Sequence, residues 1–185
     1  MSTLIQERVI ETLRKLKLDT AAEALPALLA DATRRALPLV ELMDLVMGQE
    51  LAARSERGLI ARMKLAHFPT LKSLDTFDVE EQPSLDRRLF NDLATMGFLG
   101  RQECVALLGP PGVGKTHLAI GLGVKAVELG YRAYFLSAQD LLHAIQSARM
   151  DGIPGHKQRH LTAVPLLIID LCGVVGYVEL TAIRL

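Results

Sequence analysis

One glycine-rich segment, Gly109-Pro110-Pro111-Gly112-Val113-Gly114-Lys115-Thr116, constrains the fold of this chain more than any other feature. It matches G-x-x-x-x-G-K-[ST], the pattern of a phosphate-binding P-loop. The apolar run Cys104 to Leu108 before it predicts a buried strand, and a helical pattern follows it. Such a loop points backbone N–H groups at a phosphate at the start of a helix, and its glycines let the backbone come close to the anion. We expect Lys115 to neutralise the phosphates and the Thr116 hydroxyl to ligate Mg²⁺.

The residues after the loop predict alternating helices and strands. A helix over 115–129 precedes a strand over 132–136, a second helix to about Met150 and an apolar strand over 166–170. Helices that alternate with apolar strands are typical of a parallel sheet covered by helices. The predicted fold class is therefore α/β.

Asp170 stands at the carboxyl end of the predicted strand Leu166 to Asp170, which has the pattern of a Walker B strand. An acid in this position, beside the P-loop strand, can hold Mg²⁺ through water. A buried strand that ends in aspartate is common, so a plain strand-end cap is the alternative. The P-loop upstream favours the metal-binding interpretation.

The first 66 residues have a helical pattern throughout. Thr20-x-x-Glu23 predicts a capping box before the second helix, and Pro38 opens a long third helix to about Leu65. Glu50 and Arg54 have the i,i+4 spacing of an ion pair. Turn-like residues follow, so we expect a helical module over 1–66 and a nucleotide-binding domain over 67–185.

Further local signals complete this prediction. Pro83 begins an expected helix that ends at Gly97, and Ser137-x-x-Asp140 is a second capping box. Three basic side chains of the third helix lie within one sector and are candidates for DNA phosphates, with a solvated helix face as the alternative: Arg54, Arg57 and Lys64. His156, Lys157, Arg159 and His160 predict a basic loop.

Composition narrows the class of protein. Half of the 185 residues are hydrophobic, which suffices for a sizeable core, and the formal net charge of zero argues neither for nor against a nucleic-acid partner. Two cysteines are too few for a disulfide framework and are expected to be small buried residues in a reduced compartment. The charged N-terminus excludes a signal peptide, and no apolar stretch has the length of a membrane span. We expect a cytoplasmic protein with no membrane partner.

Residues 1 to about 170 resemble the IstB-like helper ATPases of bacterial insertion sequences, relatives of the DnaC helicase loader. The resemblance depends on five stretches: Glu50-x-x-x-Arg54-x-x-Arg57, Leu74-Asp75-Thr76-Phe77-Asp78, Leu108 through Leu118 (LGPPGVGKTHL), Gly130-Tyr131-Arg132 and Leu166 to Asp170. It implies an AAA+ fold, ATP binding and hydrolysis, DNA binding, assistance to a transposase and assembly of subunits. It also places Phe77 near the adenine base, although a core aromatic is an equal alternative.

The chain departs from this family after Asp170. The resemblance implies a glutamate at the next position, where it would orient the attacking water, but the residue here is Leu171, which cannot accept a proton. The last fifteen residues do not follow the family pattern, and the expected sensor strand between the P-loop strand and the Walker B strand is missing. We therefore expect a domain truncated after Walker B, by a frameshift or a shortened chain. Residues 178–183 alternate like a strand and are a candidate to fill the gap.

The sequence thus predicts a helical N-terminal module followed by an incomplete AAA+ P-loop domain, acting as an ATP-binding accessory protein of DNA transposition that hydrolyses ATP poorly. The alternative is a non-enzymatic helical fragment that binds DNA or a transposase beside a decayed nucleotide domain. Expected ligands are ATP and Mg²⁺, with DNA, the transposase of the same element and a second copy as partners. The residues assigned to the nucleotide are Gly109, Pro110, Pro111, Gly112, Val113, Gly114, Lys115, Thr116 and His117, and those assigned to the metal are Thr116 and Asp170. The side chain of His117 is expected to pack near the loop and to have no catalytic role.

Overall fold

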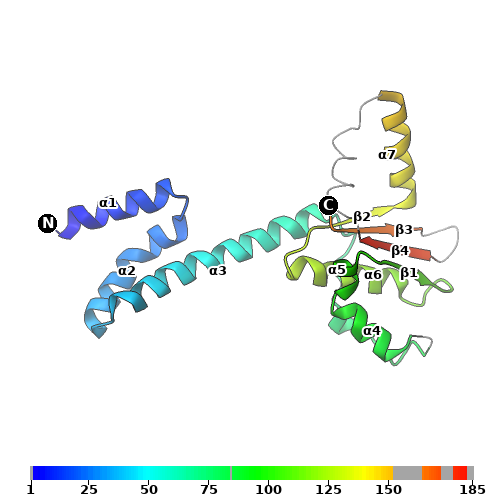
Figure 1. The fold of residues 1–185 in the computed structure, drawn as a ribbon, viewed down its shortest axis with the longest axis horizontal. Helices are drawn as coiled ribbons and strands as arrows, with labels where there is room; N and C mark the ends of the chain where they lie inside the picture. Colours follow the sequence, from blue (N-terminus) through cyan, green and yellow to red (C-terminus); the bar gives the residue numbers. More distant parts are fainter. Residues whose placement is uncertain (1, 84, 152–163, 172–176, 183–185) are drawn as a thin grey trace. The chain divides into compact units, whose positions relative to one another are not determined.

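A computed structural model describes residues 2–83, 85–151, 164–171 and 177–182 (Figure 1). The predicted basic loop over 156–160 and Cys172 lie outside these residues. The chain divides into two compact units, Met1–Gly58 and Leu59–Leu185, and the division falls within the long helix α3 (Leu39–Leu65). Each unit is described separately below.

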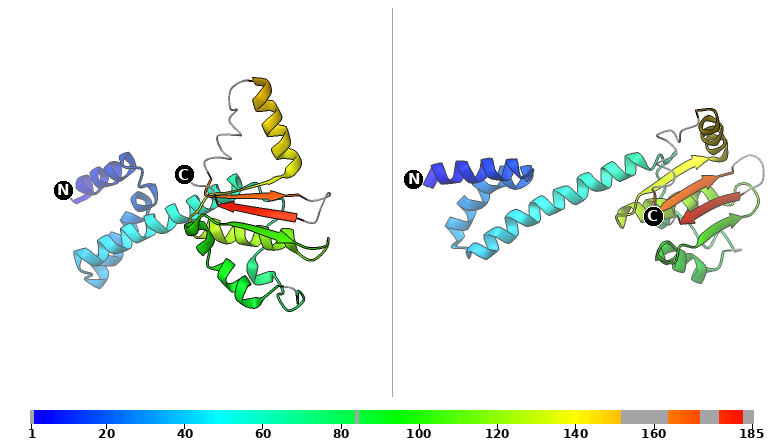
Figure 2. Two further views of the ribbon diagram at one scale, coloured as in Figure 1. Left: turned by 45° about the vertical axis from the view of Figure 1, so that its right-hand side comes forward. Right: turned by 45° about the horizontal axis from the view of Figure 1, so that its top comes forward.

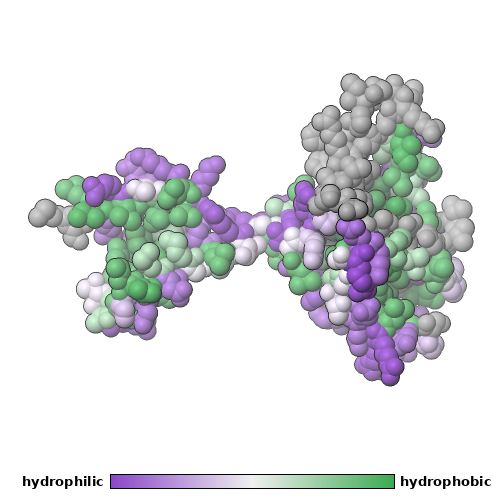
Figure 3. Space-filling view, viewed as in Figure 1, coloured by the Kyte–Doolittle hydropathy of each residue, from purple (hydrophilic) through white to green (hydrophobic). Residues whose placement is uncertain are grey.

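The first unit consists of α1 (Ser2–Lys15), α2 (Asp19–Arg35) and the first part of α3, as the helical periodicity predicts. Its core is small and forms around Ala21, Leu25 and Val46. Many large apolar side chains of this unit remain exposed, and Figure 3 shows hydrophobic residues gathered over its visible face. The exposed set includes Leu4, Ile5, Leu16, Leu39, Val40, Met43 and Leu51.

The start of α2 differs from the sequence prediction. The helix begins at Asp19, the N-cap residue is Leu18, and no side chain caps it, so the predicted Thr20 capping box is wrong. Instead, Glu50 of α3 accepts a hydrogen bond from the Ala21 N–H through Oε2 at 3.0 Å. A carboxylate from a different helix therefore satisfies one of the N–H groups that a helix start leaves without an intrahelical partner.

Glu50 also anchors two arginines. Its Oε1 accepts hydrogen bonds from Arg54 Nε at 3.2 Å and from Arg57 Nη2 at 3.1 Å, while only 4% of its side chain is exposed. The Ala21 N–H and the two guanidinium groups hold the pKa of the Glu50 carboxyl below its usual range, against the opposing effect of burial. The predicted Glu50–Arg54 pair is confirmed. Both arginines thus have a structural partner within this unit.

The second unit contains a four-stranded sheet in the order β1-β4-β3-β2 (Figure 2). The strands are β1 (Cys104–Leu108), β2 (Ala133–Ser137), β3 (Leu166–Asp170) and β4 (Tyr177–Ala182). β2 and β3 are parallel, and β1 runs in the same direction as β3 because both are antiparallel to β4. The α/β class is confirmed, but the sheet is mixed and not parallel throughout as predicted.

The direction of β4 has a simple cause. Only residues 171–176 separate it from β3, and a parallel neighbour needs a crossover connection of a dozen or more residues. The position of β4 agrees with the expectation that residues near 178–183 fill the gap between the P-loop strand and the Walker B strand. Val178 pairs with both Leu107 and Asp170, and Leu180 with both Val105 and Ile168. The inserted strand therefore supplies backbone partners to both neighbours.

Helices cover the two faces of the sheet unequally. α6 (Lys115–Glu128) packs on one face with a core that includes Leu118, Leu122, Leu166 and Ile168. On the opposite face, Leu141 of α7 (Ala138–Asp151) packs against Leu136 and Leu167. That face of β1 is open: Cys104 and Leu108 are exposed, so the expectation of a buried Cys104 is wrong.

The segment before the sheet forms a short 3₁₀ turn, η1 (Leu74–Thr76), and two short helices, α4 (Arg87–Ala94) and α5 (Gly97–Arg101). The predicted single helix from Pro83 to Gly97 is wrong at both ends. Asp86 caps α4 by accepting from the Arg88 N–H at 2.8 Å, and Met96, at φ +60°, separates the two helices. No helix among the described residues is both long and apolar enough to cross a membrane.

Candidate nucleotide-binding site

The glycine-rich loop connects the carboxyl end of β1 to the start of α6. Gly112 and Gly114 have φ values of +86° and +83°, a left-handed conformation that residues with a Cβ atom rarely adopt. Gly114 is also the N-cap of α6, and no side chain caps this helix. The first N–H groups of α6 therefore lack a side-chain acceptor and point out of the helix start, which is the arrangement that binds an anion.

Lys115 lies across the loop that it follows. Its Nζ donates a hydrogen bond to the Pro110 carbonyl oxygen at 2.6 Å, which holds the ammonium group over the loop backbone. The Val113 side chain lies 3.4 Å from the position that a Cβ atom on Gly109 would occupy. Pro110 and Pro111 are exposed at the outer side of the loop. The Lys115 ammonium group therefore lies beside the backbone of the loop.

Thr116 and Asp170 meet at the end of β3, although 54 residues separate them in the chain. The Thr116 hydroxyl donates to Asp170 Oδ2 at 3.1 Å, and Asp170 is buried at 8% exposure. Both side chains offer oxygen ligands, which Mg²⁺ prefers, and a magnesium ion in nucleotide sites commonly uses one or two such ligands together with phosphate oxygens and water. Among the described residues, no cluster of three or more His, Cys, Asp or Glu side chains could hold a metal ion. The pair fits Mg²⁺ that arrives with a nucleotide.

His117 does not point at the loop. Its Nε2 lies 3.2 Å from Thr76 Oγ1 and 3.4 Å from the Ser73 carbonyl oxygen, and its ring meets Phe77 edge-on at 5.4 Å. These contacts place the side chain against the turn Ser73–Phe77, and within that turn Phe77 also packs on Gly114 of the loop. Leu171, the residue that follows Asp170, is partly buried.

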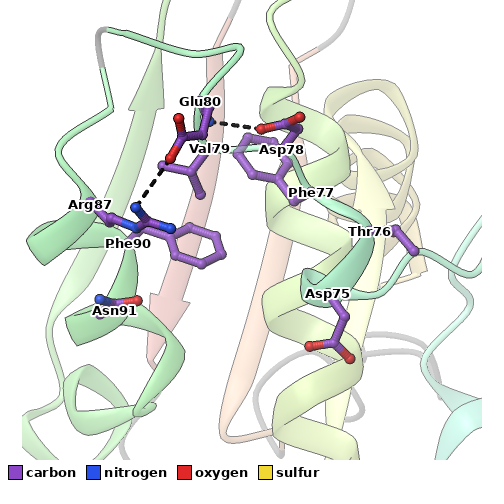
Figure 4. A pocket seen from close by; sticks show the side chains of 9 residues that line it. All are labelled: Asp75, Thr76, Phe77, Asp78, Val79, Glu80, Arg87, Phe90 and Asn91. Carbon is purple, nitrogen blue, oxygen red and sulfur yellow. Dashed lines mark hydrogen bonds and ion pairs between the residues drawn. The ribbon is translucent and has the colours of Figure 1, made fainter.

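A cavity of about 480 Å³ lies between residues 75–80 and α4 (Figure 4). The rings of Phe77 and Phe90 stack at 5.8 Å on its wall, and Phe77 also lies 3.0 Å from the position of a Cβ atom on Gly114. Its remaining lining residues are polar or small: Asp75, Thr76, Asp78, Val79, Glu80, Arg87 and Asn91. Phe77 belongs to a sequence motif, whereas Phe90, Arg87 and Asn91 were not predicted because α4 has no motif of its own.

A glycine-rich loop between a strand and a helix, with an aspartate at the carboxyl end of a second strand that runs in the same direction, defines a P-loop nucleotide-binding domain of the α/β class. Comparison with known proteins narrows this class. The model of the IstB-like ATP binding protein family matches residues 11–182. The chain therefore belongs to the IstB-like ATP-binding family, as the resemblance in the sequence predicted.

Individual relatives agree with this assignment. The chain is 36% identical to a protein of insertion sequence IS5376 from Geobacillus stearothermophilus, over 91% of this chain and 67% of the relative. It is 38% identical to a protein of insertion sequence IS21 from Pseudomonas aeruginosa, over 87% of this chain and 61% of the relative. Both relatives are named for ATP binding. The chain thus spans about two thirds of the length of the curated relatives it matches.

Proposed function

We propose that this chain binds ATP with Mg²⁺ and acts as an accessory protein of DNA transposition. The observation that supports ATP and Mg²⁺ binding most directly is the 3.1 Å contact between Thr116 and Asp170 beside an uncapped helix start. In this proposal, backbone N–H groups of 109–116 and Lys115 hold the phosphates, and Thr116 and Asp170 hold the metal. Bound Mg²⁺ would neutralise charge on the phosphate oxygens.

The base would lie in the cavity lined by Phe77 and Phe90. Phe77, which lines this cavity, lies 3.0 Å from the position of a Cβ atom on Gly114, so the cavity adjoins the loop that would hold the phosphates. An aromatic wall can stack on a purine, and the polar lining residues offer donors and acceptors to the base and the ribose. The residues of the loop itself read no base, so preference for one nucleotide over another would arise here.

The proposed accessory role rests on the names of the related proteins. They are named for insertion sequences, so we propose that the transposase of the same element, its DNA and further copies of this chain are the partners. The exposed apolar side chains of the first unit favour a protein partner for that unit. Arg54 and Arg57 keep more than half of each side chain exposed while bonded to Glu50, so both can still approach a phosphate.

We further propose that hydrolysis of bound ATP is slow. Leu171 occupies the position after the metal-binding aspartate, where the resemblance to the family implies a glutamate that orients the attacking water. A leucine neither accepts a proton nor binds water, and loss of a positioned general base typically slows a reaction about 10²–10⁴-fold.

Phosphate release at saturating ATP and Mg²⁺ tests this proposal. We expect the wild-type rate to be close to that of Lys115→Ala, and Leu171→Glu to raise it at least tenfold, whereas the uncharged control Leu171→Gln should not. A wild-type rate well above Lys115→Ala would contradict slow hydrolysis. Equal rates for Leu171→Glu and Leu171→Gln would show that residue 171 is not its cause.

A further inference from the structure

His117 joins the phosphate-loop helix to the turn that lines the cavity. It lies two residues after Lys115 on α6, yet its ring faces Ser73, Thr76 and Phe77 of the preceding segment. All three contacts connect residues about forty positions apart in the chain. The side chain is only partly exposed, so its ring is held between the helix and the turn.

The hydrogen-bond pattern fixes the role of the ring nitrogen. The Ser73 carbonyl oxygen can only accept, and the Thr76 hydroxyl already donates to that same oxygen at 2.8 Å. The tautomer of His117 with its hydrogen on Nε2 satisfies both contacts, because it can donate to the Thr76 hydroxyl oxygen at 3.2 Å and to the Ser73 carbonyl oxygen at 3.4 Å. As a donor, His117 contacts both a backbone oxygen and a side-chain oxygen of the turn Ser73–Phe77.

The same turn positions the aromatic wall of the cavity. Phe77 follows η1 directly, packs edge-on against His117 and stacks on Phe90. Leu74 packs so closely on α6 that a Cβ atom at Gly121 would come within 2.8 Å of its side chain. The turn thus packs on α6 through the apolar contact of Leu74. Hydrogen bonds from His117 of α6 fix the orientation of the turn.

We propose that His117 is a positioning residue that holds the turn Ser73–Phe77 against the phosphate-loop helix, so that Phe77 stays in place beside the base of a bound nucleotide. The inference rests on the proposed function. Because His117 contacts the turn and not the loop, it contributes to affinity for the nucleoside part of the ligand and leaves the phosphate part unchanged.

The test compares two ligands on the full chain by calorimetry: ATP with Mg²⁺, and inorganic triphosphate with Mg²⁺. His117→Ala should weaken ATP binding about tenfold, the effect of one or two lost hydrogen bonds, while triphosphate affinity stays within about twofold of wild type. His117→Gln, whose amide nitrogen can replace Nε2 as a donor, should restore most of the ATP affinity. Thr76→Val removes the acceptor from an exposed position and should reproduce the selective loss if His117→Ala does not fold.

The outcomes separate this inference from the proposed function. If the folded wild-type chain binds neither ligand, the proposed function fails, and this inference fails with it. If the wild type binds both ligands and His117→Ala weakens both equally, or weakens neither, the positioning role alone is overturned. A selective loss of ATP affinity that His117→Gln reverses supports both.

Discussion

Gly123 tests how closely α6 must approach the sheet. A Cβ atom at this position would lie 2.6 Å from Cδ1 of Ile168 and 2.7 Å from a ring carbon of Phe68. Ile168 is fully buried in β3, and a close-packed core resists the displacement of such a side chain. We therefore expect Gly123→Ala to push α6 away from β3, which is the strand that ends at Asp170.

The expected size of the effect follows from two opposing contributions. Replacing a helical glycine by alanine stabilises an open site by about 0.5–1 kcal/mol. Overpacking a close-packed core costs about 1–3 kcal/mol, and Gly123 faces two neighbours inside the distance that Cβ atoms normally keep. The cost of overpacking should exceed the gain from replacing glycine. We expect the free energy of unfolding to fall by roughly 1–2 kcal/mol, which corresponds to a Tm lower by about 3–8 °C.

Tyrosine fluorescence provides a clean assay. The three tyrosines, at 131, 134 and 177, all belong to the second unit, and the chain contains no tryptophan. Gly100→Ala is the matched control, because Gly100 is an exposed helical glycine of the same unit with no atom within 4 Å of its added Cβ. It should leave the Tm unchanged or raise it slightly. A Gly123→Ala protein as stable as Gly100→Ala would refute the close packing of α6 on β3.

Three further predictions concern the loop, the metal pair and the helical unit. Gly114→Ala forces a residue with a Cβ into φ +83° against Phe77, so we expect it to destabilise the second unit by about 1–2 kcal/mol and to weaken ATP binding, measured by melting with and without ATP. Asp170→Asn should remove most of the Mg²⁺ dependence of ATP affinity in titrations with and without the metal; unchanged dependence would exclude Asp170 as a ligand. Because the pKa of Glu50 is lowered in the folded chain, its stabilising effect is present above its ordinary pKa near 4.5 and disappears as pH falls through the lower folded value. Helix melting followed by circular dichroism should therefore lose stability below about pH 4.5 in the wild type, and Glu50→Gln should be less stable at neutral pH but less sensitive to acid.

Local sequence patterns predicted the elements that depend on neighbours in the chain. The P-loop strand, α6, β2, β3 and the capping of α7 by Ser137, which accepts from the Asp140 N–H at 3.1 Å, follow from periodicity, glycine placement and capping residues. The position of β4 was expected from the gap between two apolar strands. Its antiparallel direction depends on the length of its connection to β3, which the prediction did not consider.

The missed features depend on contacts between distant residues. Thr20 has the spacing of a capping residue, but Glu50 from another helix takes the role, and no local pattern contains that information. Phe90 and Asn91 line the cavity only because α4 packs beside the turn that contains Phe77. The motif Leu74 to Asp78 indicated one wall of the cavity, and the opposite wall became visible only in the folded chain.

Calorimetric titration of the folded chain with ATP and Mg²⁺ tests the central claim most directly, because the loop, Lys115 and the Thr116–Asp170 pair all contribute to one binding event. We expect saturable heat with one site per chain for the wild type and its loss in Lys115→Ala, with both proteins melting cooperatively. A cooperatively folded wild-type chain that gives no heat with millimolar ATP and Mg²⁺, or a Lys115→Ala chain that binds equally well, would contradict the claim.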